Sequence, residues 1–525
     1  MFEKPDEQDF CYKVLFNPNN GDAYIVFVSE YDINVDLLKL CTAIQLQRHW
    51  GKSLKVHYFL YITIVFMVIR IQTSDRGNPF INKIRNNQMN KDLRLILFSM
   101  ASLFPLCFSG LAGAVELAPD VSDAQVVAQY NYIIHILAML LIGFGFLMVF
   151  IRRYGFGAIT GTYLVVAVSL PLYILLRANG IFGHALEPHT LDALLFAELA
   201  AATALIAMGA VLGRLRVFQY ALLALLVVPL YLLNEWIVLD DAFGITTGFQ
   251  DTAGSIVIHA FGAYFGMAMS IVLTTAYQRS KPVESDPTSD RYAMLGSVVL
   301  WLFWPSFATA LVPLEQMPQT VVNTLLALSG ATIATYFVST MVNKGKTSMV
   351  DMANAALAGG VAIGSICDVA NPAGAFAIGL LAGTISVLGY RYLLPALEAK
   401  FKLYDTCGVH NLHGMPGLLG GFSAFLIIPP SVATAQLAGI GITLLIAIAG
   451  GLIAGMLVKL TGTTREPYED SVEFSHTEGP EAEATVAKLQ ARIEALENQS
   501  ITQQSTAQAD LSEFRTDPDK PAPQG

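Results

Sequence analysis

Eleven apolar segments follow one another between residues 131 and 459, and they decide what the chain can fold into. Each is long enough to cross the hydrocarbon core of a bilayer, about 30 Å thick, as an α-helix. Of all residues 54% are hydrophobic and only 14% are charged, whereas soluble domains carry about 25% charged residues. The sequence therefore predicts an all-α membrane protein with eleven transmembrane helices. They span residues 131–151, 157–177, 191–212, 217–239, 252–277, 292–313, 320–342, 350–367, 373–390, 407–428 and 434–459.

Basic residues gather in every second loop between these spans, and the opposite loops hold few of them apart from Arg177. Because loops rich in Lys and Arg stay in the cytoplasm, the pattern predicts an N-terminus outside and a C-terminus inside. The basic set comprises Arg152, Arg153, Arg214, Arg216, Arg279, Lys281, Arg291, Lys344, Lys346, Arg391, Lys400, Lys402, Lys459 and Arg465, and the acidic residues of the opposite loops are Glu187, Asp240, Asp241, Glu315 and Asp368.

A short motif occurs twice in the chain. Asp251-Thr-Ala-Gly and Asp405-Thr-Cys-Gly are each followed by a histidine eight positions after the aspartate, at His259 and His413. Eight helical residues rise about 12 Å, so each histidine is expected near the middle of the bilayer. Spans one to five and six to ten have opposite orientations. We therefore expect two inverted five-helix repeats plus a C-terminal helix, with both histidines meeting at the repeat interface.

The two histidines predict the chemistry of a transport site. A lone buried histidine is usually structural, but two at equivalent depths in a membrane indicate function, because polar groups there are costly. Neutral imidazoles can hydrogen-bond each other and still bind a small polar molecule. Burying an unpaired cation costs up to tens of kcal/mol, whereas an amine with a pKa near 10 loses its proton at pH 7 for roughly 4 kcal/mol. We therefore expect a narrow pore that passes a small weak base as the neutral molecule.

Asp251 and Asp405 have a different expected role, as structural caps at the starts of the pore helices with no substrate contact. His410 precedes His413 by one turn. It fits either a hydrogen-bonded helix residue or a place in the inner exit. The five cysteines show no metal-ligand spacing. We expect neither a metal nor a cofactor.

The two ends of the chain differ from this domain, which covers residues 115–460. Residues 89–114 read as a signal peptide, with a basic start, an apolar stretch and the site Ala112-Gly-Ala114. Since signal peptides act at N-termini, we expect translation to start at Met89 and residues 1–88 to be a spurious extension. A retained membrane helix is the alternative.

The tail, residues 461–525, is polar and acidic and accounts for much of the net charge of -10. Its composition predicts a largely disordered cytoplasmic segment. Within it, residues 484–498 place apolar side chains at the 3-4-3 spacing of a short coiled coil, a pattern that also fits a lone solvated helix.

Linked motifs across residues 131–460 also carry a family resemblance. They resemble the Rhesus branch of the ammonium transporter/Rhesus superfamily, in particular its bacterial members from ammonia oxidisers. Residues 1–88 share nothing with it. The motifs are Gly143-Phe-Gly-Phe-Leu-Met148, Arg153-Tyr-Gly-Phe156, Gly209-Ala-Val-Leu-Gly213, Asn234-Glu235, Gly254 to Gly266, Trp304-Pro-Ser-Phe307 and Asp405 to Gly421.

The resemblance implies a homotrimer with one ammonia-conducting pore per subunit and no enzymatic activity. His259 and His413 match the family's twin pore histidines. Phe307 matches the inner of two stacked aromatics that close the outer entrance in many members. The outer aromatic position holds Leu199 here, which suggests a looser entrance.

The outer vestibule departs from the ammonium transporter branch as well. The tryptophan that binds the cation there has no clear match, and Leu239 sits near its position. Glu235, beside Asn234, would instead supply negative charge, as the Rhesus branch implies. This weaker cation site suggests low affinity and passive, electroneutral flux, although the twin-histidine family also includes electrogenic members.

The expected function is therefore passage of ammonia through the bacterial inner membrane, with methylammonia as a further candidate permeant. Three alternatives stay open at this stage: a carbon dioxide channel, an ammonium sensor that signals through the tail, and an intramembrane metal-dependent enzyme built on His259, His410 and His413.

Overall fold

The computed structural model describes residues 12–16, 23–27, 123–462, 464, 466–475 and 488–496. The chain divides into two compact units, Met1–Ala114 and Val115–Gly525. In the first unit, strands β1 (Tyr12–Phe16) and β2 (Ala23–Phe27) pair in antiparallel fashion. The predicted signal peptide at 89–114 lies outside the described residues.

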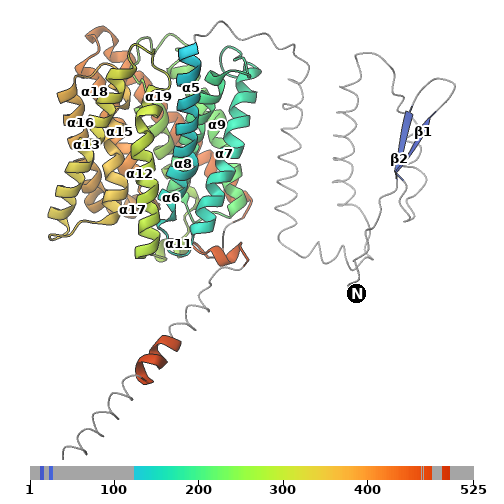
Figure 1. The fold of residues 1–525 in the computed structure, drawn as a ribbon, viewed down its shortest axis with the longest axis vertical. Helices are drawn as coiled ribbons and strands as arrows, with labels where there is room; N and C mark the ends of the chain where they lie inside the picture. Colours follow the sequence, from blue (N-terminus) through green and yellow to red (C-terminus); the bar gives the residue numbers. More distant parts are fainter. Residues whose placement is uncertain are drawn as a thin grey trace, which may run out of the picture. The chain divides into compact units, whose positions relative to one another are not determined.

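The second unit is a bundle of helices (Figure 1). Its first half contains α5 (Asp123–Ala138), η1 (Met139–Phe144), α6 (Gly145–Leu147), η2 (Met148–Phe150), α7 (Gly155–Ala178), α8 (Leu191–Val211), α9 (Val217–Val238), η3 (Ser255–Ala260) and α10 (Phe261–Leu273). The short helix α11 (Ala276–Ser280) leads to the second half.

The second half contains α12 (Pro287–Thr309), α13 (Met317–Val342), α14 (Met349–Asn354), η4 (Ala355–Leu357), α15 (Ala358–Ile363), η5 (Gly364–Ile366), α16 (Pro372–Leu388), η6 (Gly389–Leu393), α17 (Leu394–Phe401), η7 (His410–Gly414), α18 (Met415–Ser423) and η8 (Ala424–Leu426). The chain then continues through η9 (Pro430–Val432), α19 (Ala433–Leu460) and η10 (Asp470–Val472).

Within the described residues, ten helical stretches are long and apolar enough to cross a membrane. The run of η7, α18 and η8 from His410 to Leu426 supplies the eleventh span. The predicted all-α fold with eleven spans is confirmed, but its bounds differ. The first helix begins at Asp123, not 131, and the ninth stretch ends at Phe401, not 390. Hydropathy marks only the part of a helix that lies in hydrocarbon, so polar extensions escape it.

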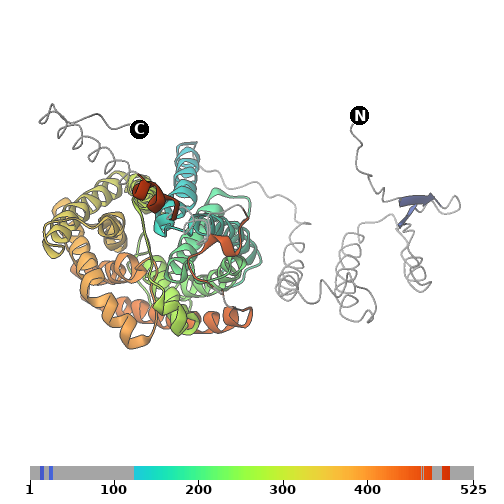
Figure 2. The same ribbon diagram turned by 90° about the horizontal axis from the view of Figure 1, so that it is seen from below.

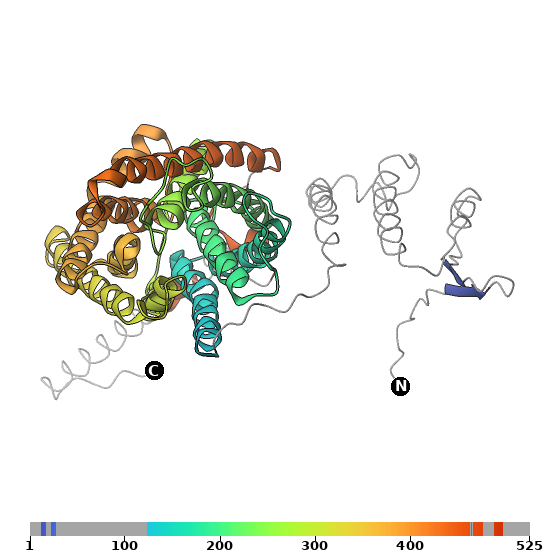
Figure 3. The ribbon, with the colours of Figure 1, turned by 90° about the horizontal axis from the view of Figure 1, so that it is seen from above.

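Viewed along the helix axes, the two halves occupy neighbouring sectors of the bundle, and α19 runs along one edge (Figures 2 and 3). Glycines allow the closest helix contacts. Gly451 of α19 packs against the carbonyl oxygen of Phe265 in α10, and Gly379 of α16 packs against that of Ala327 in α13, each too closely to leave room for a Cβ atom. Such close backbone approach is how membrane helices gain packing energy in the absence of a hydrophobic drive between them.

The start of the tail, residues 466–475, folds back onto the bundle, whereas the expectation of a largely disordered tail stays a prediction for the rest. Asp470 accepts hydrogen bonds from the backbone N–H groups of Phe156 and Gly157 at 2.8 and 2.7 Å, and thereby caps α7. Tyr468 N–H donates to the Gly213 carbonyl at 2.8 Å. Because α7 begins with no side-chain cap of its own, these otherwise unpaired N–H groups draw a distant carboxylate to the helix. Residues 488–496 are also helical.

Candidate functional site

Both pore helices begin in the same way. Asp251 accepts hydrogen bonds from the N–H groups of Ile256 and Val257 at 2.9–3.1 Å. Asp405 accepts them from Val409 and His410 at 3.0 and 2.9 Å. Burial raises the pKa of both carboxyl groups above the ordinary value, and these hydrogen bonds oppose the shift.

A left-handed glycine ends each Asp-Thr-x-Gly motif, with φ of 72° at Gly254 and 69° at Gly408. Only glycine adopts this conformation without strain, so the motif sets the angle at which the chain enters the helix. The first turns that follow, η3 and η7, are π-helical, and they carry His259 and His413. Since π-turns are rare and cluster at functional sites, the histidines sit on a specialised piece of backbone.

The two histidines form a hydrogen-bonded pair. Their Nδ1 atoms are 3.1 Å apart, and their rings are stacked with 5.3 Å between centroids and 8° between planes. Each side chain is buried, with 3% of its surface exposed. His259 Nε2 has no hydrogen-bond partner among the described residues. His259 Nε2 is therefore left available to a small permeant molecule.

The tautomers of a neutral pair are complementary. If one Nδ1 carries the proton and donates, its own Nε2 is a bare acceptor, while the Nε2 of the other ring carries a proton. The neutral pair thus offers one acceptor and one donor outside the shared hydrogen bond. An added proton would turn both Nε2 atoms into donors, which removes the acceptor that an ammonium N–H needs.

Aromatic rings enclose the pair. Trp304 stacks on His259 with 5.7 Å between centroids, and Phe307 lies 5.8 Å from the same ring. Phe144 lies 6.2 Å from His413 on the other side. Sequence reasoning identified Phe307 but not Trp304 or Phe144. The sequence could have indicated Trp304, because it lies three positions before Phe307 and residues three apart share a helix face.

An outer cavity of about 20 Å³ adjoins Phe307, on the face that the charge pattern assigns to the outside. This volume admits about one molecule the size of water. Leu199, Glu235 and Asp251 line it, so three of the predicted site residues meet Phe307 there. Leu239 lines it too.

Glu235 is held in place by two tyrosines. Tyr173 donates to Glu235 Oε2 at 2.6 Å and Tyr231 to Oε1 at 3.4 Å. Tyr231 lies four residues before Glu235 on α9, a spacing that predicts contact, whereas Tyr173 comes from α7 and could not be found this way. The carboxylate is therefore fixed at the outer cavity, and no ion pair within 4.0 Å joins it to a basic side chain among the described residues.

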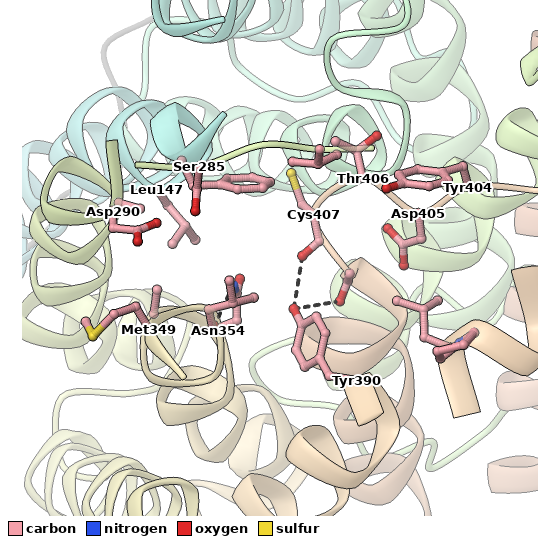
Figure 4. A pocket seen from close by; sticks show the side chains of 18 of the residues that line it. Leu147, Ser285, Asp290, Met349, Asn354, Tyr390, Tyr404, Asp405, Thr406 and Cys407 are labelled. Carbon is pink, nitrogen blue, oxygen red and sulfur yellow. Dashed lines mark hydrogen bonds between the residues drawn. The ribbon is translucent and has the colours of Figure 1, made fainter. Parts of the chain in front are cut away.

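On the other side of the histidines, a cavity of about 20 Å³ is lined by His413, Phe144 and Leu205, among others. It shares Asn354 and Cys407 with a larger inner cavity of about 310 Å³. Figure 4 shows this inner cavity, where Tyr390 donates to the carbonyl oxygens of Cys407 and Gly408. Its polar lining consists of Ser285, Asp290, Asn354, Tyr390, Glu398, Tyr404, Asp405 and Thr406.

Besides His259, which touches Phe307 but lines none of the three cavities, two predicted site residues lie apart from them. Asn234 is fully buried, and both its amide atoms lack partners among the described residues. Successive helical residues point about 100° apart, so with Glu235 at the cavity Asn234 faces elsewhere. His410 packs edge-on against Tyr264, 5.8 Å between centroids, and lines none of the three cavities above. Its place in the inner exit stays a prediction.

No cluster of three or more His, Cys, Asp or Glu side chains in the described part of the chain could hold a metal ion. The metal-enzyme alternative thus finds no site in that part.

A model described as the Ammonium Transporter Family matches residues 98–478. The chain belongs to this family. "Ammonium transporter Rh type B" from Oryctolagus cuniculus is 39% identical over 386 residues, covering 67% of this chain and 83% of that protein. The Homo sapiens protein of the same description is 37% identical over 414 residues, covering 72% and 89%.

Solved structures agree. One described as "Nitrosomonas europaea Rh50 and mechanism of conduction by Rhesus protein family of channels" is 70% identical with a TM-score of 0.70, and the match covers 73% of this chain and 100% of that chain. A "Sensor Amt Protein" at 20% identity and TM-score 0.55 shares the fold. The chain therefore lies in the Rhesus branch, close to the bacterial Rhesus protein, as its motifs predicted. These relatives are transporters and channels, not enzymes.

Proposed function

We propose that the chain conducts ammonia through the bacterial inner membrane as the neutral molecule. The observation that carries this proposal is the buried His259–His413 pair between two cavities, each with room for about one small molecule. The assembly is a homotrimer with one pore in each subunit, an N-terminus outside and the tail in the cytoplasm.

Ammonium reaches the outer cavity first. Glu235 faces it with a carboxylate fixed by Tyr173 and Tyr231, which favours a cation there. Leu199 and Phe307 then limit the passage to one small molecule. Beyond Phe307 the walls are aromatic, so a charged permeant would lose hydration with no anion to replace it. The proton therefore leaves on the outer side of Phe307.

Ammonia next meets the histidine pair. It has one lone pair and three N–H donors, so it can donate to the bare Nε2 of the pair and accept from the Nε2–H. Ammonium has donors only, so it can donate to the bare Nε2 but cannot accept from the Nε2–H. The pair thus favours the neutral molecule. The inner cavity, with the carboxyl groups of Asp290, Glu398 and Asp405 in its walls, allows protonation again on the cytoplasmic side.

Replacement of each histidine by alanine tests the proposal. Purified wild-type, His259→Ala and His413→Ala proteins would be reconstituted, and ammonia entry followed by the rise in internal pH. Because the two rings act as one hydrogen-bonded unit, each single variant should lose about as much flux as the double variant. Ammonia flux equal to wild type in both single variants would remove the pair from the pathway, and a wild type with no flux above empty vesicles would refute the function.

A further inference from the structure

Two histidines contact one segment of α12 on adjacent faces, since residues one position apart on a helix point about 100° apart. On the pore side, Trp304 and Phe307 both contact the ring of His259. On the neighbouring face, the ring of His135, from the first span, stacks on Phe303 with 4.7 Å between centroids and 20° between planes. The segment from Phe303 to Phe307, called the clamped segment below, therefore contacts both the central pair and a histidine of α5.

His135 also makes a hydrogen bond to this segment. Its Nδ1 lies 2.8 Å from Ser306 Oγ, and Ser306 is the residue directly before Phe307. A polar side chain in a membrane helix is costly unless it is paired. This pair joins α5 to α12, the first helices of the two inverted halves.

The clamped segment is one that needs support. Pro305 lies in its middle and has no N–H to donate, which weakens the helix locally and favours bending. Phe307 lines the outer cavity together with Leu199, whose side chain offers no ring to stack on Phe307. The contact that His135 makes with α12 can supply the support that a second aromatic ring would otherwise give Phe307.

We propose that His135 is a positioning residue for the outer constriction: bound to Ser306 and stacked on Phe303, it holds Phe307 against His259. This inference rests on the proposed ammonia conduction. Without the clamp, Phe307 moves more freely, and the passage admits larger amines more easily. Ammonia is already small enough to pass, so the flux of methylammonium should rise more than the flux of ammonia.

Three single variants and one double variant separate the hydrogen bond to Ser306 from the stacking on Phe303. His135→Phe keeps a ring on Phe303 but loses the hydrogen bond, and Ser306→Ala loses the same bond from the other side. Each should raise the methylammonium-to-ammonia flux ratio about fivefold, the effect expected for one lost hydrogen bond. The double variant should show no further rise, because both changes remove one interaction. His135→Asn places an amide near the Nδ1 position but has no ring for Phe303, so the flux ratio should return part of the way to the wild-type value.

Tyr132→Phe is the matched control. Tyr132 lies three residues before His135 on α5, and its hydroxyl donates to Met317 Sδ of α13 at 2.8 Å. Its loss removes a hydrogen bond between α5 and the second half of the chain without touching the clamped segment. The flux ratio should stay at the wild-type value.

The ratio of two fluxes in the same vesicles does not depend on how much protein has folded. An unchanged ratio in both His135→Phe and Ser306→Ala would overturn the inference, as would an equal rise in Tyr132→Phe, which would indicate general loosening of α5. Absence of ammonia flux in the wild type would instead overturn the proposed function.

Discussion

Neutralising Glu235 should weaken the recruitment of ammonium without slowing its passage. Glu235→Gln keeps the shape of the side chain and removes its charge. For a cation about 8 Å away in a medium of effective dielectric about 20, the lost attraction is about 2 kcal/mol, a factor of about 30 in local concentration. The ammonium concentration that gives half-maximal flux should rise by up to this factor, while the maximal flux stays near that of wild type.

Asp240 supplies the control. It belongs to the same outer face, but 42% of its side chain is exposed, so water and salt screen its charge far more than that of the buried Glu235. Asp240→Asn removes one negative charge and should change the half-maximal concentration much less. The assay is the concentration dependence of internal alkalinisation in proteoliposomes, at about 0.01 M and 0.15 M salt. Because Glu235 is buried, with 5% of its surface exposed, and salt screens buried charges much less than exposed ones, the difference between wild type and Glu235→Gln should persist at the higher salt. A fall in maximal flux with an unchanged half-maximal concentration would refute this reasoning.

Three further predictions concern the entrance, a helix start and the tail. Leu199→Phe should fill the outer cavity and cut methylammonium flux about tenfold, which corresponds to a barrier rise of about 1.4 kcal/mol. The same vesicle assay measures this flux. An unchanged flux would show that the cavity is not on the path. The raised pKa of Asp251 means that its protonated form is favoured in the folded protein. The stability of wild type relative to Asp251→Asn should therefore fall as pH rises from about 4 through the raised pKa; a melting-temperature difference that is constant with pH would contradict this. Asp470→Ala should cost about 1 kcal/mol at the start of α7 and release the tail, seen as faster proteolysis after residue 462; unchanged proteolysis would count against the cap.

The fold could be predicted because its signals are local. Apolar length and loop charge specify the spans, and the repeated Asp-Thr-x-Gly motif relates the two halves. Helix rise places both histidines at the same depth. The π-turns that carry them could not be read from sequence, because no residue pattern distinguishes η3 and η7 from α-helix.

Contacts between segments far apart in the chain could not be predicted from the sequence either. Tyr173 reaches Glu235 from a helix 62 positions earlier, and His135 reaches Ser306 across 171 positions. Their meeting depends on how the helices pack, which hydropathy does not encode. The docking of residues 466–475 was missed for a related reason. Composition measures the average polarity of a segment, whereas Asp470 is held by specific unpaired N–H groups of α7.

The decisive property of the pore is the charge of the permeant, and simultaneous recording of current and internal pH measures it. Proteoliposomes containing the wild-type protein would receive an inward ammonium gradient while current and internal pH are followed together. Passage as ammonia past His259 and His413 predicts a rise in internal pH that far exceeds that of empty vesicles, with no sustained current. A lasting inward current that matches the amount of ammonium taken up would mean that charge crosses the histidine pair, and neutral passage would be wrong.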